Sequence, residues 1–258
     1  MMKSLLRSLV LLALTFAGAA CQGTNLYSVQ DDVAMGAAAF DEVKATESLI
    51  YSGPAYEQVQ RVTSRVVAAA IDIDPEISNS FAWEVVLIDD DDMVNAFCLP
   101  GGKMAVYTGI LPVAGSDDGL AVVIGHEIAH ATCRHGTQRA TQSVLTEIGI
   151  EIFTESAEFS TDQEERELAT ILAEVGLGLP FSRDHELEAD RVGLYYMAAA
   201  GYDPREAIGF WQRMSAGGGG APPEWLSTHP SDSTRIRKMR EILPEVLPIY
   251  QAAQISDS

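Results

Sequence analysis

The segment AVVIGHEIAHATCRHG (residues 121–136) carries three histidines and a glutamate in a largely apolar stretch, and it constrains the fold more than any other part of the chain. His126 and His130 are four residues apart, so on a helix they lie on the same side, one turn apart. Both rings can then reach one ion, and zinc accepts imidazole nitrogen at about 2.0–2.1 Å. Two buried imidazoles without a metal would each need another polar partner. The spacing therefore predicts a buried helix that supplies two zinc ligands.

Glu127 follows His126 directly and is rotated from it by about a quarter turn around the helix. Its carboxylate then lies beside the metal, where a general base for a metal-activated water is needed. We predict that Glu127 takes the proton of that water during attack on a peptide carbonyl and passes it to the leaving amine. The predicted cofactor is one Zn²⁺ per chain.

A catalytic zinc site with an open position needs a third protein ligand. The extended motif H-E-x-x-H-x-x-G-x-x-H is excluded, because Cys133 and Gly136 stand where it requires Gly and His. The later segment HELEAD (185–190) places Glu186 and Asp190 four residues apart on one helical face. Glu186 is therefore the predicted third ligand, and Asp190 is predicted to accept a hydrogen bond from a ligand imidazole.

Three nearby residues receive no role in the metal site. On a continuous helix over 117–145, His135 falls on another face from the two ligands, as a surface or second-layer residue. Glu188 falls on another face from Glu186 and is expected in solvent. Cys133, close to the motif, and the more distant Cys98 either form a disulfide or stay as buried thiols. A thiol mechanism is disfavoured, because a hydrolytic thiol needs an activating histidine in reach.

A formal net charge of -20 argues against nucleic acid as a partner, since phosphate contacts need Lys and Arg.

The start of the chain differs in composition from the rest. A basic start, an apolar run over 9–16 and small residues before Cys21 predict a signal peptide over 1–20. We predict that Cys21 is acylated, as in bacterial lipoproteins, and that Gln22 favours the outer membrane. Cleavage near Ala20, leaving a soluble periplasmic protein, is the alternative.

The order of predicted elements favours one α+β domain over 31–250, with a tether over 21–30 and a C-terminal tail over 251–258. Extended segments are expected on both sides of a Pro-Gly-Gly turn. The predicted helices cover 29–50, 56–71, 117–145, 183–200, 204–214 and 231–243, and the extended segments cover 81–89 and 95–111.

Four pieces of the chain resemble the gluzincin-type zinc metallopeptidases that include HtpX-like, Oma-like and CAAX-prenyl-protease-like enzymes. They are NAFCLPGGKMAVYTGIL, GHEIAHATCRHG, SRDHELEADRVGL and STHPSDSTRI. The chain looks closest to the periplasmic lipoprotein proteases of the BepA and LoiP kind. This resemblance implies a mainly helical zincin-like domain with a small sheet, and its E-x-x-x-D pattern maps onto Glu186 and Asp190. It also implies a lipid-anchored periplasmic endopeptidase that acts on unfolded or misassembled envelope proteins.

The same resemblance gives a role to His229, and the residues themselves suggest a role for a second segment. His229 in STHP would approach the zinc and hold the enzyme inactive, with the run Gly217–Gly220 letting it move. A loop-capping histidine that touches nothing and an oxyanion donor are the alternatives. Residues Asn95, Ala96 and Phe97 fit an edge strand beside the cleft, where an extended substrate can add a strand. A plain hairpin is the alternative there.

A metal-holding chaperone or assembly factor with latent proteolysis is the competing function. Glu127 favours an enzyme, because a scaffold has no use for a general base.

Overall fold

The computed structural model describes residues 23–154, 181–216, 224–229 and 233–256. The predicted signal peptide, the predicted acylation site Cys21 and the run Gly217–Gly220 lie outside the described residues. The described helices are α2 (Val29–Thr46), α3 (Pro54–Ile73), α4 (Pro75–Ser78), α5 (Leu111–Ala114), α6 (Asp117–Thr132), α7 (His135–Thr154), α9 (Arg183–Ala199), α10 (Glu206–Ala216), α11 (Glu224–Thr228) and α12 (Ser233–Ser256). The strands are β1 (Leu49–Ile50), β2 (Glu84–Ile88), β3 (Ala96–Leu99) and β4 (Lys103–Tyr107). No helix of this described part is long and apolar enough to cross a bilayer.

The strands form one mixed sheet in the order β1-β2-β4-β3. Strands β2 and β4 run parallel, and the other two pairs are antiparallel. Gly101 and Gly102 connect β3 to β4 with φ of 73° and 88°, a region that favours glycine. Strand β3 therefore lies at one edge of the sheet, and the predicted α+β fold with its edge strand is confirmed.

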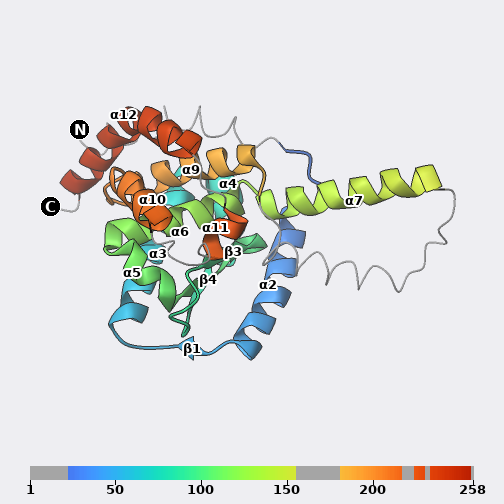
Figure 1. Ribbon diagram of the computed structural model, residues 1–258, viewed down its shortest axis with the longest axis horizontal. Coiled ribbons are helices and arrows are strands. Elements are labelled where there is room, and N and C mark those ends of the chain that lie inside the picture. Colours follow the sequence, from blue (N-terminus) through green and yellow to red (C-terminus); the bar gives the residue numbers. More distant parts are fainter. Residues whose placement is uncertain (1–22, 155–180, 217–223, 230–232, 257–258) are drawn as a thin grey trace.

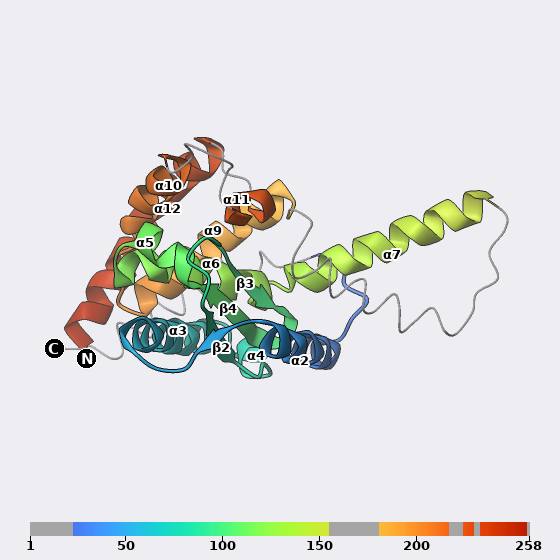
Figure 2. The ribbon, with the colours of Figure 1, turned by 60° about the horizontal axis from the view of Figure 1, so that its bottom comes forward.

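Alternation along the strands divides the core into two layers. Val85 and Leu87 of β2 face the main core, which also contains the apolar faces of α3, α6 and α9. Val86 and Ile88 face the opposite side, where Phe40 of α2 packs on them. The sheet is thus buried on both faces. Figures 1 and 2 show this body with α7 extending away from it on one side.

Helices α6 and α9 cross in direct backbone contact, and this crossing positions the candidate site. Gly125 and Gly193 meet there: a Cβ on Gly125 would lie 2.8 Å from the carbonyl oxygen of Gly193. Any larger side chain would push the helices apart. The contact places His126, the next residue on α6, opposite the face of α9 that carries Glu186 and Asp190.

The single helix predicted over 117–145 is wrong, because the chain breaks between α6 and α7 at Arg134. This residue has a φ of 58°, which is uncommon without glycine. Its guanidinium is bound by buried Asp32 of α2, at 2.5 and 3.1 Å, and by the carbonyl oxygen of Tyr27, at 2.6 Å. These contacts hold a turn that helix propensity would not select.

Both ends of the predicted domain differ from expectation. Residues 23–28 of the predicted tether pack on α7: the Asn25 side chain donates to Thr137 Oγ1 at 2.8 Å. The predicted tail instead continues α12 to Ser256, despite prolines at 244 and 248. Val246, Ile249 and Ala253 are buried at helical spacing, and their packing offsets the loss of backbone hydrogen bonds at the prolines.

Candidate metal centre

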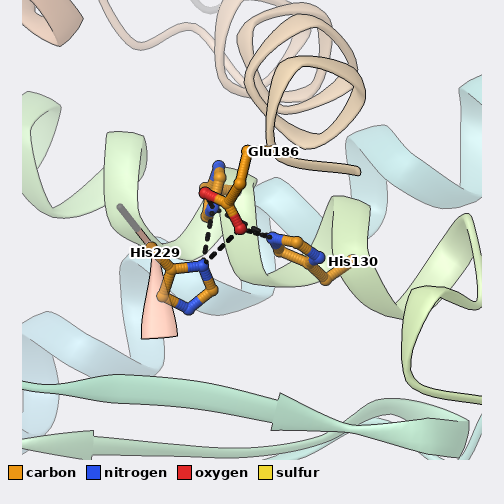
Figure 3. Close-up of side chains that lie close together, drawn as sticks. His130, Glu186 and His229 are labelled. Atoms are coloured by element: carbon orange, nitrogen blue, oxygen red, sulfur yellow. Dashed lines mark hydrogen bonds and ion pairs between the residues drawn. The ribbon is translucent and has the colours of Figure 1, made fainter. Parts of the chain in front are cut away.

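Four side chains from three separate segments converge at the centre of the body. His126 and His130 come from α6, Glu186 from α9 and His229 from the residue after α11. In Figure 3 the rings of His130 and His229 point toward the Glu186 carboxylate. All four side chains are buried, with at most 3% of their surface exposed. The structure therefore brings together the three predicted ligands and adds a fourth candidate.

The distances between these donor atoms fit a zinc ion. Tetrahedral donors at zinc–ligand distances of about 2.0–2.1 Å are separated by about 3.3 Å. Here Nε2 of His126 lies 3.0 Å from Nε2 of His130 and 3.3 Å from Nδ1 of His229. The Glu186 oxygens lie 3.6 Å from His126 Nε2 and 3.4 Å from His130 Nε2. Zinc is one cation that this donor set suits, and the ligand roles stay predictions.

The electrostatics of the cluster favour a cation between its members. Burial lowers the pKa of His130 well below its ordinary value, which keeps that ring neutral. Burial by itself raises the pKa of Glu186. The charge on His229 and hydrogen bonds from the imidazoles more than offset this effect and hold the pKa of Glu186 well below its usual range. Burial lowers the pKa of His126, whereas its bonds to Asp190 and Glu186 raise it to about 9. A metal ion binding here would replace the proton on His126.

Asp190 lies where it was expected, one helical turn from Glu186. Its Oδ1 is 3.1 Å from Nδ1 of His126, so the carboxylate lies directly against that ring. Arg235 of α12 then holds both acids: its guanidinium lies 2.6 and 2.7 Å from the Asp190 oxygens and 2.5 Å from Glu186 Oε2. The cation also lies 4.0 Å from the ring of Trp211.

Arg235 contacts two residues of the candidate site, and no role was predicted for it. It is 3% exposed, and it shares the buried face of α12 with Met239 and Ile242, four and seven residues later. A cation on an apolar helical face was the signal available in the sequence, since buried charges are found with partners.

Glu127 is buried beside the cluster, and its carboxylate is covered. Nε1 of Trp225 in α11 donates to Glu127 Oε1 at 3.0 Å, and Nε2 of His229 lies 3.5 Å from the same oxygen. The backbone N–H of Trp225 also donates to the carbonyl oxygen of Val94, just before β3, at 3.2 Å. Segment α11 therefore closes the site in this structure. Trp225 was missed in the sequence, and a histidine at 229 that touches nothing is excluded.

The expectations for His135 and Glu188 were partly wrong. His135 is completely buried, and its Nδ1 lies 2.9 Å from Nδ1 of His130. Glu188 lies 2.9 Å from the other ring nitrogen of His135 and is partly buried rather than free in solvent. The reason is the turn at Arg134, which returns the chain beside His130. Of the two alternatives for His135, the second layer is the one the structure supports.

The residues proposed to meet a substrate strand are mostly buried. Asn95 accepts a hydrogen bond from the backbone N–H of Ala96 at 2.9 Å, and Phe97 packs near Tyr107 on the α2 side of the sheet. Their side chains thus hold the hairpin, and a contact with substrate stays a prediction. The Cys98 thiol is free, so it forms no disulfide with Cys133, and burial raises its pKa well above the ordinary value.

Residues 55–243 match the model of peptidase family M48. The mitochondrial metalloendopeptidase OMA1 of Schizosaccharomyces pombe is 39% identical over 194 residues, which cover 74% of this chain and 55% of that protein. The protein of the same name from Saccharomyces cerevisiae is 33% identical over 211 residues, covering 77% and 59%. The beta-barrel assembly-enhancing protease of Yersinia pestis is 26% identical over 270 residues, covering 96% and 54%. The chain spans about half the length of these relatives.

The predicted resemblance to Oma-like and BepA-like metallopeptidases is thereby confirmed. The predicted location in the periplasm, anchored to the outer membrane, is contradicted. The relatives that are 33% and 39% identical over three quarters of the chain are mitochondrial proteins by name, so this prediction is wrong.

Proposed function

The chain belongs to peptidase family M48, and from that premise we propose that it is a zinc-dependent endopeptidase. The observation that carries the proposal is the convergence of His126, His130 and Glu186 on one buried point, with Glu127 beside it. The three side chains come from two helices held in register by the glycine crossing, so the arrangement is built into the core of the fold.

In this proposal His126, His130 and Glu186 hold the zinc. When bound, the ion supplies Lewis acidity, which makes a water more acidic and polarises a peptide carbonyl. Glu127 accepts the proton of the attacking water and delivers it to the amine that leaves. Asp190 and Arg235 keep His126 and Glu186 in place while the charge on the site changes.

We further propose that α11 must move before a substrate enters. In the closed arrangement His229 is the fourth side chain around the cluster. Trp225 donates a hydrogen bond to the Glu127 oxygen that has to accept a proton. The backbone N–H of Trp225 also donates to the carbonyl oxygen of Val94, at the point where an extended substrate would begin to pair with β3. We therefore expect the substrates to be unfolded or misassembled proteins, because only a chain without structure of its own can add a strand to β3.

The closed site also favours a second function, a metal-holding chaperone or assembly factor with latent proteolysis. Cleavage by the isolated protein discriminates between the two. We expect about one zinc per purified chain, casein cleavage that a chelator abolishes, and recovery when zinc is restored. Zinc binding without cleavage under any condition would favour the chaperone, and a wild-type protein that binds no zinc would overturn the proposed site.

Replacing His229 with Ala is expected to raise casein cleavage several-fold with the zinc content unchanged. The reason is that the variant removes a group that blocks the site in the closed state, and the population of open molecules rises. Initial rates and zinc content are measured together. Thr228→Ala is the matched control, because the side chain of this neighbour donates to the carbonyl oxygen of Trp225 and does not belong to the cluster. Lower cleavage in His229→Ala would instead identify His229 as an oxyanion donor.

A further inference from the structure

A line of close contacts joins Glu188 of α9, through His135, to the predicted zinc ligand His130. Glu188 Oε2 lies 2.9 Å from Nε2 of His135, and Nδ1 of His135 lies 2.9 Å from Nδ1 of His130. The remaining nitrogen of His130, Nε2, points into the metal cluster. Every ring nitrogen along this path therefore has one neighbour on the path or in the cluster.

With a neutral His135, the hydrogen-bonding chemistry allows one direction of donation along this path. An ionised carboxylate only accepts, so Nε2 of His135 carries the hydrogen and donates to Glu188. A neutral His135 then has a lone pair on Nδ1, which accepts from Nδ1–H of His130. His130 is left with a lone pair on Nε2, the form that a metal ion requires. Glu188 thus determines, through an intervening ring, which nitrogen of His130 is protonated.

The two imidazoles of α6 are supported in different ways. His126 meets a carboxylate directly, with its Nδ1 3.1 Å from Asp190. Nδ1 of His130 instead meets a second ring, because Nδ1 of His135 lies 2.9 Å from it. His135 is itself fixed by stacking on His185, with ring centroids 4.3 Å apart and an angle of 13° between the planes.

We propose that Glu188 and His135 form a relay that positions His130 for zinc, so that both are positioning residues for the metal site. The proposal rests on the zinc binding proposed above. It assigns a role to two residues that are not fixed positions of the H-E-x-x-H and E-x-x-x-D patterns, since Glu188 stands at a variable position of the second. The turn at Arg134 is what makes the relay possible, because a continuous helix would carry His135 away from His130.

The test is the zinc dissociation constant of the full chain, measured by competition with a chelator, together with the thermal midpoint of the metal-free protein. His135→Phe keeps a ring of similar shape without nitrogens, and we expect it to weaken zinc binding by about 10–100-fold. Glu188→Ala is expected to weaken it by about 10-fold and Glu188→Gln by less, since the amide oxygen still accepts from His135. Asp184→Asn removes a charge from an exposed position of the same helix and serves as the control.

The double variant, His135→Phe with Glu188→Ala, decides between a relay and two separate effects. Because Glu188 acts through His135, the double variant is expected to bind zinc as tightly as His135→Phe alone, to within about 2-fold. Losses that multiply would overturn the relay, as would wild-type affinity in Glu188→Ala, a partly exposed position where folding is not at risk. A lower thermal midpoint with unchanged zinc affinity would show a structural role only. Wild-type protein that binds no zinc would instead overturn the proposed function.

Discussion

Glu127→Gln is expected to lower casein cleavage by about 10²–10⁴-fold and to leave the zinc content at the wild-type level. The side chain lies beside the three predicted ligands and makes no contact that a metal ion would need, so its loss removes proton transfer without removing the ion. Gln has nearly the same shape, and its amide oxygen still accepts the hydrogen bond from Trp225 that the carboxylate accepts at 3.0 Å. The measurement is the initial cleavage rate, normalised to zinc.

The outcome of this variant bears on both candidate functions. A chaperone with latent proteolysis would keep its protective effect on unfolded protein when Glu127 is replaced, because holding a chain needs no general base. Cleavage at the wild-type rate in zinc-loaded Glu127→Gln would show that another group transfers the proton, and the assignment of Glu127 would be wrong. The His229→Ala variant is the natural background for the assay, since an open site makes a loss of rate easier to measure.

Glu186→Ala is expected to weaken zinc binding by more than about 100-fold and to abolish cleavage at ordinary zinc concentrations. Loss of a direct ligand should exceed the 10–100-fold typical of outer residues. The variant also removes one of the two carboxylates that pair with Arg235, the one whose Oε2 lies 2.5 Å from its guanidinium in the native protein. The Arg235 cation is then less well compensated, directly beside the place where a metal cation must bind. Chelator competition gives the affinity, and circular dichroism checks that the fold is kept.

His229→Ala is the partner experiment, because four side chains converge on the point and a catalytic site uses three with one position open. Zinc affinity that survives His229→Ala but not Glu186→Ala would identify the carboxylate as the permanent third ligand. The reverse pattern would make His229 the ligand and Glu186 a supporting residue, and the predicted E-x-x-x-D assignment would then be wrong.

Local spacing was enough to predict several features of this protein. His126 and His130 lie on one face of α6 because residues four apart do so on any α-helix, and the same holds for Glu186 and Asp190 on α9. The turn around Gly101 and Gly102 could also be predicted, because glycine accepts a positive φ without strain. In each case the residues concerned belong to one continuous element, so chain geometry alone places them.

The features that sequence reading missed all depend on contacts between distant segments. Arg134 has no local reason to adopt a φ of 58°; the buried carboxylate of Asp32, about a hundred residues earlier, holds it there. That turn places His135 against His130 and Glu188. The closure of Glu127 by Trp225 likewise joins residues far apart in the chain.

The sequence by itself determined which side chains could hold a metal and which could move a proton, because those properties follow from residue type and from spacing within one helix. The tertiary structure alone decided which side chains support the ligands and which cover them. Those choices depend on how separate helices pack, and packing is selected by the free energy of the whole core rather than by any local segment.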